Sequence, residues 1–259
     1  MIPVDTLAPF ALLVGLVAVS SAVGIRDGRQ FLAGQRRAIG IWIAFVLVYV
    51  AYRGVANLLP RVIDAGVEDQ LIAVDEWLLG VSPSFWMQRL AAPWLTELMA
   101  FGYALMFVMP LVLLLLAQAR RRWDDMGALA WTLTWTFGLG LAGYVLVPAR
   151  SPRLVYAYAT ELSGLGLYES SQWMWDHLQA ATFDAFPSLH TAVSTVSLIW
   201  AWRLGEALSR RRPRLLFGIY LPFVVLLQLS TLYLRQHYFV DLIGGWVLAT
   251  ALCAARRRP

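Results

Sequence analysis

The chain has 259 residues, of which 59% are hydrophobic and 14% charged, and its formal net charge is +5. A soluble domain cannot bury so large an apolar fraction, so the composition indicates a membrane protein. All 21 basic residues are arginine, which excludes mechanisms built on a lysine Schiff base. The single cysteine, Cys253, has no partner for a disulfide within the chain.

Seven segments are long and apolar enough to span a bilayer, or nearly so. They are residues 7–24, 39–59, 93–118, 128–149, 188–205, 215–234 and 238–254. No positive side chain precedes the first segment, so we expect a retained helix there and not a signal peptide. Because no internal repeat or low-complexity linker interrupts the chain, residues 1–259 are expected to form one all-α, polytopic membrane domain.

The arginines are distributed unevenly between the two sides of the predicted bundle. Fifteen of them end or follow the first, third, fifth and seventh segments, where only four acidic residues occur. They are Arg26, Arg29, Arg36, Arg37, Arg120, Arg121, Arg122, Arg203, Arg210, Arg211, Arg212, Arg214, Arg256, Arg257 and Arg258. The positive-inside rule makes this side cytoplasmic, with the N-terminus outside and the C-terminus inside. The basic charge then reflects topology and anionic lipid, and no nucleic-acid site is expected.

Two long connections, roughly 60–92 and 150–187, fall on the outer side. In the first, residues 67–80 place apolar side chains at helical spacing and end in glycine, which predicts a helix lying in the membrane interface. The second is rich in tyrosine and tryptophan, whose rings suit the headgroup layer. Asp176 and Asp184 in this connection are interpreted as solvated charges.

Three polar clusters lie at helix ends on this outer side. His190 begins the fifth span, His237 precedes the seventh, and Arg150 and Arg153 follow the fourth in the stretch "PARSPR". The predicted topology brings all of them to one membrane face. Arg53 and Glu97 lie in the outer parts of two helices, where they either pair with each other or line a substrate path.

The stretch "FPSLH" favours a helix start, with Ser188 as a candidate cap. The free N–H groups and the positive end of the helix dipole at such a start suit phosphate oxygens. Arg150 and Arg153 would add forked, permanently charged donors. In "HYFVD", His237 and Asp241 share one helix face because they are four residues apart.

These residue types support phosphoryl transfer through a histidine nucleophile. The Asp241 carboxylate would keep one nitrogen of His237 protonated and leave the other free to attack. His190 would serve first as general acid and then as general base. Because such a reaction depends mainly on positioning and charge neutralisation, we expect neither a metal ion nor a cofactor.

Two of these stretches resemble motifs of the type 2 phosphatidic acid phosphatase superfamily. "FPSLH" is similar to its Pro-Ser-Gly-His motif. "STLYLRQHYFVD" is similar to its third motif, which reads Ser-Arg, five residues, His, three residues, Asp. Within the superfamily, the leucine in place of glycine and the stretch "HYFVDLIGG" most resemble the branch that contains inositol phosphorylceramide synthase. "PARSPR" is similar to the first motif of that branch, and the resemblance spans residues 50–254.

The resemblance implies a six-helix core, about residues 39–254, with one additional N-terminal helix. It also implies that His237 becomes a phosphohistidine, that Asp241 supports it and that His190 is the acid and base. Ser188, Arg150 and Arg153 would bind the phosphate.

The chain departs from the superfamily pattern at three places. Leu189 replaces a glycine, Thr231 replaces the arginine of the third motif, and the leading lysine of the first motif is missing. Arg235 lies near the replaced arginine and is therefore a further candidate substrate ligand. Similar departures occur in lipid headgroup transferases of the superfamily, so they favour transfer.

The predicted function is cleavage or transfer of a lipid-linked phosphate or phosphorylated headgroup at the outer membrane face. A lipid alcohol would capture the phosphohistidine in a transferase of the inositol phosphorylceramide synthase type. Water would capture it in a phosphatase acting on phosphatidate, phosphatidylglycerophosphate or polyprenyl pyrophosphate. A non-catalytic lipid transporter and a structural membrane subunit remain alternatives. The bacterial-like size of the chain, without extra domains, favours hydrolysis slightly. We expect a bacterial cytoplasmic membrane, with the site on the periplasmic side.

Overall fold

The computed structural model describes residues 28–176, 182–209 and 211–256. Within these residues every regular secondary-structure element is a helix and no β-strand occurs, which confirms the all-α prediction. In chain order the helices are α2 (Gly28–Val62), α3 (Glu68–Leu79), α4 (Pro83–Met87), η2 (Gln88–Leu90), α5 (Pro93–Ala119), α6 (Trp123–Leu146), α7 (Pro152–Val155), α8 (Leu167–Met174), α9 (Leu189–Leu208), α10 (Leu215–Tyr233) and α11 (Phe239–Ala255). The predicted span at residues 7–24 lies outside the described residues.

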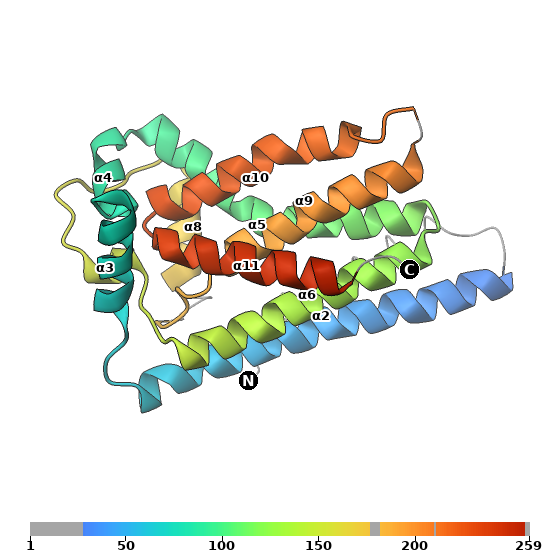
Figure 1. The fold of residues 1–259 in the computed structure, drawn as a ribbon, viewed down its shortest axis with the longest axis horizontal. Coiled ribbons are helices and arrows are strands. Elements are labelled where there is room, and N and C mark those ends of the chain that lie inside the picture. The colour runs from blue at the N-terminus through green and yellow to red at the C-terminus, as the bar shows by residue number, and fades with distance from the viewer. Residues whose placement is uncertain (1–27, 177–181, 210, 257–259) are drawn as a thin grey trace.

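Six long helices, α2, α5, α6, α9, α10 and α11, run along one axis as a bundle (Figure 1). Among the described residues, four segments are long and apolar enough to cross a membrane: Ile39–Val62, Pro93–Ala119, Trp123–Leu146 and Leu215–Tyr233. Large apolar side chains such as Leu47, Phe107, Leu146 and Val247 are exposed on the bundle surface. Lipid tails can cover such a surface and water cannot do so cheaply, so the chain is an integral membrane protein.

Helix α9 forms the centre of the bundle, because it contacts α5, α6, α10 and α11. Its side chains are buried on almost every side, including those of Val193, Val196 and Trp200. It also contains serines whose hydroxyls donate back to the helix itself, Ser194 to the Thr191 carbonyl and Ser197 to the Val193 carbonyl. A helix enclosed by neighbours tolerates such residues because their polar groups are satisfied within the helix.

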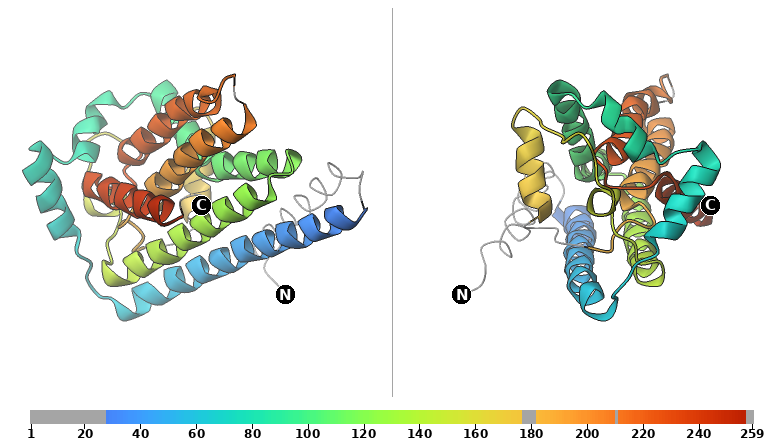
Figure 2. Two further views of the ribbon diagram at one scale, coloured as in Figure 1. Left: turned by 45° about the vertical axis from the view of Figure 1, so that its right-hand side comes forward. Right: turned by 90° about the vertical axis from the view of Figure 1, so that its left-hand side faces the viewer.

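The shorter helices α3, α4 and α8 lie towards one end of the bundle, where α3 runs across the bundle axis and α8 stands on the other side of the bundle from α3 (Figures 1 and 2). As predicted, α3 ends at Gly80, which adopts the left-handed conformation with φ of 76°. The helix ends that carry the predicted site, including the starts of α9 and α11, lie at this same end. The arginine-rich connections around Arg120, Arg122, Arg214 and Arg256 lie at the opposite end.

Glycines allow α11 and α6 to pack closely against the start of α9. A Cβ atom on Gly245 would lie 2.6 Å from the Ser188 carbonyl oxygen, and one on Gly140 would lie 2.4 Å from a Leu189 methyl group. The missing side chains therefore let the starts of α9 and α11 approach backbone to backbone. This close packing holds the segments that contain the two predicted histidines against each other.

Candidate active site

His237 lies in the tight connection between α10 and α11. Its Nδ1 atom is 2.9 Å from the Ala185 carbonyl oxygen and 3.4 Å from Oδ2 of Asp241. Both neighbours are acceptors, so the hydrogen bonds require Nδ1 to carry the proton. The lone pair of Nε2 is then free, which is the protonation pattern that a nucleophilic imidazole needs.

Asp241 is fully buried in the first turn of α11. Its Oδ2 atom accepts a hydrogen bond of 2.8 Å from the backbone N–H of Tyr238, so the carboxylate also caps its own helix. This bond fixes the carboxylate beside the His237 ring. The Oδ1 atom is buried and has no hydrogen-bond partner within the protein.

His190 is the second residue of α9 and is 8% exposed. Its ring lies over the ring of Tyr103 from α5, with centroids 3.9 Å apart and planes inclined by 30°. The ring centroids of His190 and His237 are 5.6 Å apart. The Nε2 atom of His190 is buried without a protein partner. Two imidazoles from different helices therefore meet at one end of the bundle, close enough for one substrate group to contact both.

Ser188 is fully buried and adopts the predicted capping position of α9. Its Oγ atom accepts a hydrogen bond of 3.2 Å from the Thr191 N–H. Its own N–H donates to the Asp241 carbonyl oxygen at 3.0 Å, which joins the starts of α9 and α11. In this structure the serine hydroxyl is engaged with its own helix.

Backbone hydrogen bonds connect the three predicted motif segments to one another. The Ala185 N–H donates to the Ala149 carbonyl oxygen at 3.1 Å, and the Arg153 N–H donates to the Arg235 carbonyl oxygen at 2.8 Å. Three segments that are far apart in the sequence thus form one assembly. The sequence predicted that they would share a membrane face, and the structure brings them into direct contact.

The three candidate arginines have different surroundings. Arg150 is bound to Glu68 of α3 by its backbone N–H at 2.8 Å and by Nε at 2.9 Å. Its side chain is 43% exposed and lies outside the cavity described below. Arg153 donates from Nη1 to Asp176 at 3.0 Å, and its Nε atom is buried without a protein partner.

Arg235 adopts the left-handed conformation, with φ of 63°, in the turn before His237. Its guanidinium lies 3.7 Å above the ring of Tyr158 and donates to the Thr160 carbonyl oxygen. Burial lowers the pKa of Arg235 and raises that of Tyr158 to about 12. The guanidinium nevertheless stays protonated and the phenol neutral near pH 7, so this pair adds positive charge to the site.

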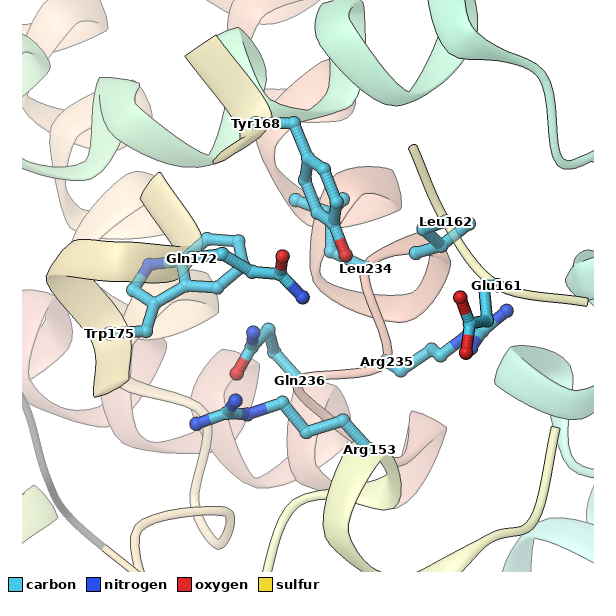
Figure 3. A pocket seen from close by; sticks show the side chains of 9 residues that line it. All are labelled: Arg153, Glu161, Leu162, Tyr168, Gln172, Trp175, Leu234, Arg235 and Gln236. Carbon is cyan, nitrogen blue, oxygen red and sulfur yellow. The ribbon is translucent and has the colours of Figure 1, made fainter. Parts of the chain in front are cut away.

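A cavity of about 350 Å³ lies at the turn that precedes His237, and neither histidine is among the residues that line it. It is lined by Arg153, Glu161, Leu162, Tyr168, Gln172, Trp175, Leu234, Arg235 and Gln236 (Figure 3). Several lining donors are buried without a protein partner: Nε of Arg153, Nε of Arg235, Nε2 of Gln236 and Nε1 of Trp175. Buried donors without a partner are rare in folded proteins, which sets this lining apart from an ordinary packed interior.

Sequence reasoning missed the amide and aromatic members of this lining. Trp175 packs edge-on against Tyr103, and Tyr103 also contacts His190, so the cavity wall is connected to His190 through Tyr103. The only signal in the sequence was that Gln236 adjoins His237. Nothing local distinguishes Gln172 or Trp175 from ordinary interface residues, because α8 meets the turn before α11 only in the tertiary structure.

The prediction that Asp184 is a solvated charge is wrong, whereas the predicted roles of Arg53 and Glu97 stay predictions. Asp184 accepts a hydrogen bond from the Tyr52 hydroxyl at 2.9 Å, and burial raises its pKa, so it is not a solvated loop charge. Glu97 binds the backbone N–H groups of Leu165, Leu167 and Tyr168, which satisfies free donors at the start of α8. Both carboxylates compensate polar groups that tertiary packing brings to them.

The family model of the PAP2 superfamily matches residues 69–255, which include both histidines and the whole cavity lining. The chain belongs to the PAP2 superfamily. This membership makes it a membrane-embedded enzyme of the lipid phosphatase and phosphotransferase family, with a lipid as its substrate.

One curated relative is the catalytic subunit of inositol phosphorylceramide synthase from Schizosaccharomyces pombe, which is 45% identical over 67 residues. The match covers 26% of this PAP2 chain and 14% of the relative, so it concerns only a small part of that protein. No solved structure matches the chain.

Proposed function

We propose that this PAP2 protein transfers a phosphorylated headgroup from a lipid donor to a lipid hydroxyl through a phosphohistidine on His237. The observation that carries the proposal is the 5.6 Å separation of the His190 and His237 rings, with a cavity lined by two arginines at the turn that precedes His237. A nucleophile, an acid–base group and charge-neutralising donors together are what phosphoryl transfer requires.

In the first step, Nε2 of His237 attacks the phosphorus atom of the donor. A nitrogen–phosphorus bond forms while the bond from phosphorus to the lipid oxygen breaks. His190, which the negative charge of the bound phosphate keeps protonated at this stage, gives its proton to the departing oxygen, and the donor lipid leaves as an alcohol. The Ala185 carbonyl and Asp241 accept hydrogen bonds from the Nδ1–H group, which stabilises the positive charge that develops on the His237 ring.

In the second step, His190 removes a proton from the acceptor hydroxyl. The acceptor oxygen bonds to phosphorus as the nitrogen–phosphorus bond breaks, and His237 returns to its starting form. Arg153 and Arg235 neutralise the charge of the phosphoryl oxygens in both steps. In this proposal the positive charge comes from these two guanidinium groups and not from a metal ion.

The cavity supports transfer of a whole headgroup more than hydrolysis of a bare phosphate. A space of about 350 Å³ exceeds what a single phosphate fills. The Gln172 and Gln236 amides, the Tyr168 hydroxyl and the Trp175 indole present donors and acceptors that suit a polyhydroxylated group (Figure 3). The named activity of the yeast relative, inositol phosphorylceramide synthesis, is of this kind.

We further propose that residues 1–259 form one domain whose site faces the extracytoplasmic side, which is periplasmic in a bacterial inner membrane. The support is the arginine distribution, because the arginine-rich end lies opposite the cavity and the positive-inside rule assigns that end to the cytoplasm.

The test is an assay on purified protein in nanodiscs with phosphatidylinositol labelled in its phosphorylated headgroup, with or without ceramide or diacylglycerol. A new labelled lipid, distinct from the phosphatidylinositol donor, should form only when an acceptor lipid is added, and it should form in the presence of EDTA. This result supports the proposal. Water-soluble label released regardless of acceptor would make the protein a phosphatase. Vanadate should inhibit, and His237→Ala should show neither product. Turnover by His237→Ala close to wild type would overturn the assignment of the nucleophile.

A further inference from the structure

Helix α3 presents one buried face to the active site, and that face contains two carboxylates. Glu68, Leu71 and Asp75 are 4%, 7% and 0% exposed, while their neighbours Asp69 and Glu76 are exposed to the surroundings. Spacings of three and four residues put the buried three on one side of the helix. A fully buried carboxylate is costly unless it receives hydrogen bonds, so the partners of Asp75 are informative.

Asp75 binds the first turn of α11. Its Oδ2 atom accepts from the Phe239 N–H at 2.8 Å, and its Oδ1 atom accepts from the Val240 N–H at 2.9 Å. These are free donors at a helix start, where a negative charge also complements the helix dipole. Together with the bond from Tyr238 to Asp241, they fix the backbone that immediately follows His237.

The rest of the buried face of α3 holds the other motif segments. Glu68 binds the backbone N–H and Nε of Arg150, and Leu71 lies in one apolar cluster with Ala149, Ala185 and Tyr238. The carbonyl of Ala185 is the acceptor 2.9 Å from Nδ1 of His237. One short helix outside the bundle therefore contacts all three segments that form the site.

We propose that α3 is a positioning helix and that Asp75 sets the orientation of the His237 imidazole through the first turn of α11. Asp75 is outside the cavity lining and touches no group that reacts, so its effect is exerted on the rate of the chemical step and not on substrate binding. This inference rests on the proposed role of His237 as the nucleophile. Loss of the two bonds lets the turn that carries His237 shift, and small displacements of a reacting group are costly to the rate.

The experiment compares Asp75→Asn and Asp75→Ala with the charge-matched control Glu76→Gln on the exposed face of the same helix. Asp75→Ala should lower kcat by on the order of 100-fold with KM for the lipid donor within about twofold. Asp75→Asn retains one acceptor oxygen and should recover part of that loss, while Glu76→Gln should match wild type. Formation of phosphohistidine, measured by acid-labile label on the protein, should slow in parallel.

Hydrogen exchange measured on the same proteins separates positioning from a general effect on folding. In Asp75→Ala, faster exchange should be confined to the peptide containing Phe239 and Val240. Loss of protection throughout the bundle would overturn the positioning role, as would a kcat within twofold of wild type in both Asp75 variants. A wild-type protein that transfers and hydrolyses no lipid phosphate would refute the proposed function instead, whatever the exchange at α11 shows.

Discussion

The ring of His190 lies between two partners, with Tyr103 stacked 3.9 Å away and His237 5.6 Å away, measured between centroids. The tyrosine ring fixes the plane of the imidazole and leaves its buried Nε2 atom without a protein partner. Under the proposed function, a general acid held in this way would deliver a proton to an atom bonded to the same phosphorus that His237 attacks. The proposal therefore gives the two histidines separable roles.

The roles of His190 and His237 can be distinguished with two lipid donors that differ only in their leaving group. His190→Ala should lose about 10²–10⁴-fold in kcat with an ordinary lipid alcohol as leaving group, because that oxygen needs a proton. With a nitrophenol leaving group, which departs as an anion, the rate of phosphohistidine formation should stay within about tenfold of wild type. His237→Ala should be inactive with both donors, and equal losses of His190→Ala on both would contradict the general-acid role.

The two arginines of "PARSPR" should contribute unequally to activity, although the sequence alone predicts the same phosphate-binding role for both. Arg153 lines the cavity, so Arg153→Gln should lower kcat/KM by about 10- to 100-fold, the effect of losing a charged hydrogen bond of about 1.5–3 kcal/mol. Arg150→Gln should cost less than about threefold, because the backbone N–H at position 150 still binds Glu68. Steady-state assays on both variants test this order, and a larger effect at Arg150 would show that the wrong arginine was chosen.

The amide of Gln236 should select for the headgroup and not for the phosphate. Gln236→Leu removes a buried donor from the cavity and should lower kcat/KM about tenfold for a polyhydroxylated headgroup donor, equivalent to about 1.4 kcal/mol. A lipid phosphate monoester should be turned over within about threefold of wild type. Gln70→Leu on the exposed side of α3 is the matched control. A uniform loss on both donors would argue against a headgroup site.

The contact between α11 and the start of α9 should not tolerate a methyl group. Gly245→Ala puts a Cβ 2.6 Å from the Ser188 carbonyl oxygen, and backbone cannot move aside cheaply. We expect a loss of about 1–3 kcal/mol and a Tm several degrees lower in detergent. Gly218→Ala on α10, where nothing lies within 4 Å, should be neutral or slightly stabilising. Equal melting temperatures for the two variants would show that the close packing is unimportant.

The pair formed by Glu68 and Arg150 should make stability depend on acidic pH. Burial raises the pKa of Glu68. The hydrogen bonds from Arg150 and its positive charge together lower this pKa by more than burial raises it, so it lies below the ordinary 4.5. The stabilisation is therefore complete above that value and lost as pH falls through the folded pKa. The Tm of Glu68→Gln should be lower than that of wild type at pH 7, and the difference should shrink on acidification towards pH 3. A difference that persists at pH 3 would assign the effect to packing.

Patterns within single segments predicted the bundle well. Four of the predicted spans, the end of α3 at Gly80 and the cap at Ser188 follow from spacing and local chemistry, and the described residues confirm them. These features were predictable because their causes are local, namely helical periodicity, glycine in the left-handed region and a serine hydroxyl at a helix start.

The partners across the fold were not predictable in this way. The bonds from Asp75 to α11 and from Glu68 to Arg150 join segments that are far apart in the sequence. The acids look like ordinary charges of an interfacial helix until the fold shows which side of it is buried. For the same reason Asp184 was misjudged, because its partner Tyr52 belongs to a different helix.

Seven of the nine side chains around the cavity carry a polar group, and only Leu162 and Leu234 do not. Under the proposed function, fatty acid tails would not suit such a space and would stay among the surrounding lipids while the headgroup of the donor enters. The proposed enzyme would then recognise the headgroup and not tail length or unsaturation. A cell that remodels its fatty acids to keep its membrane fluid in the cold would leave the chemistry of this site unchanged.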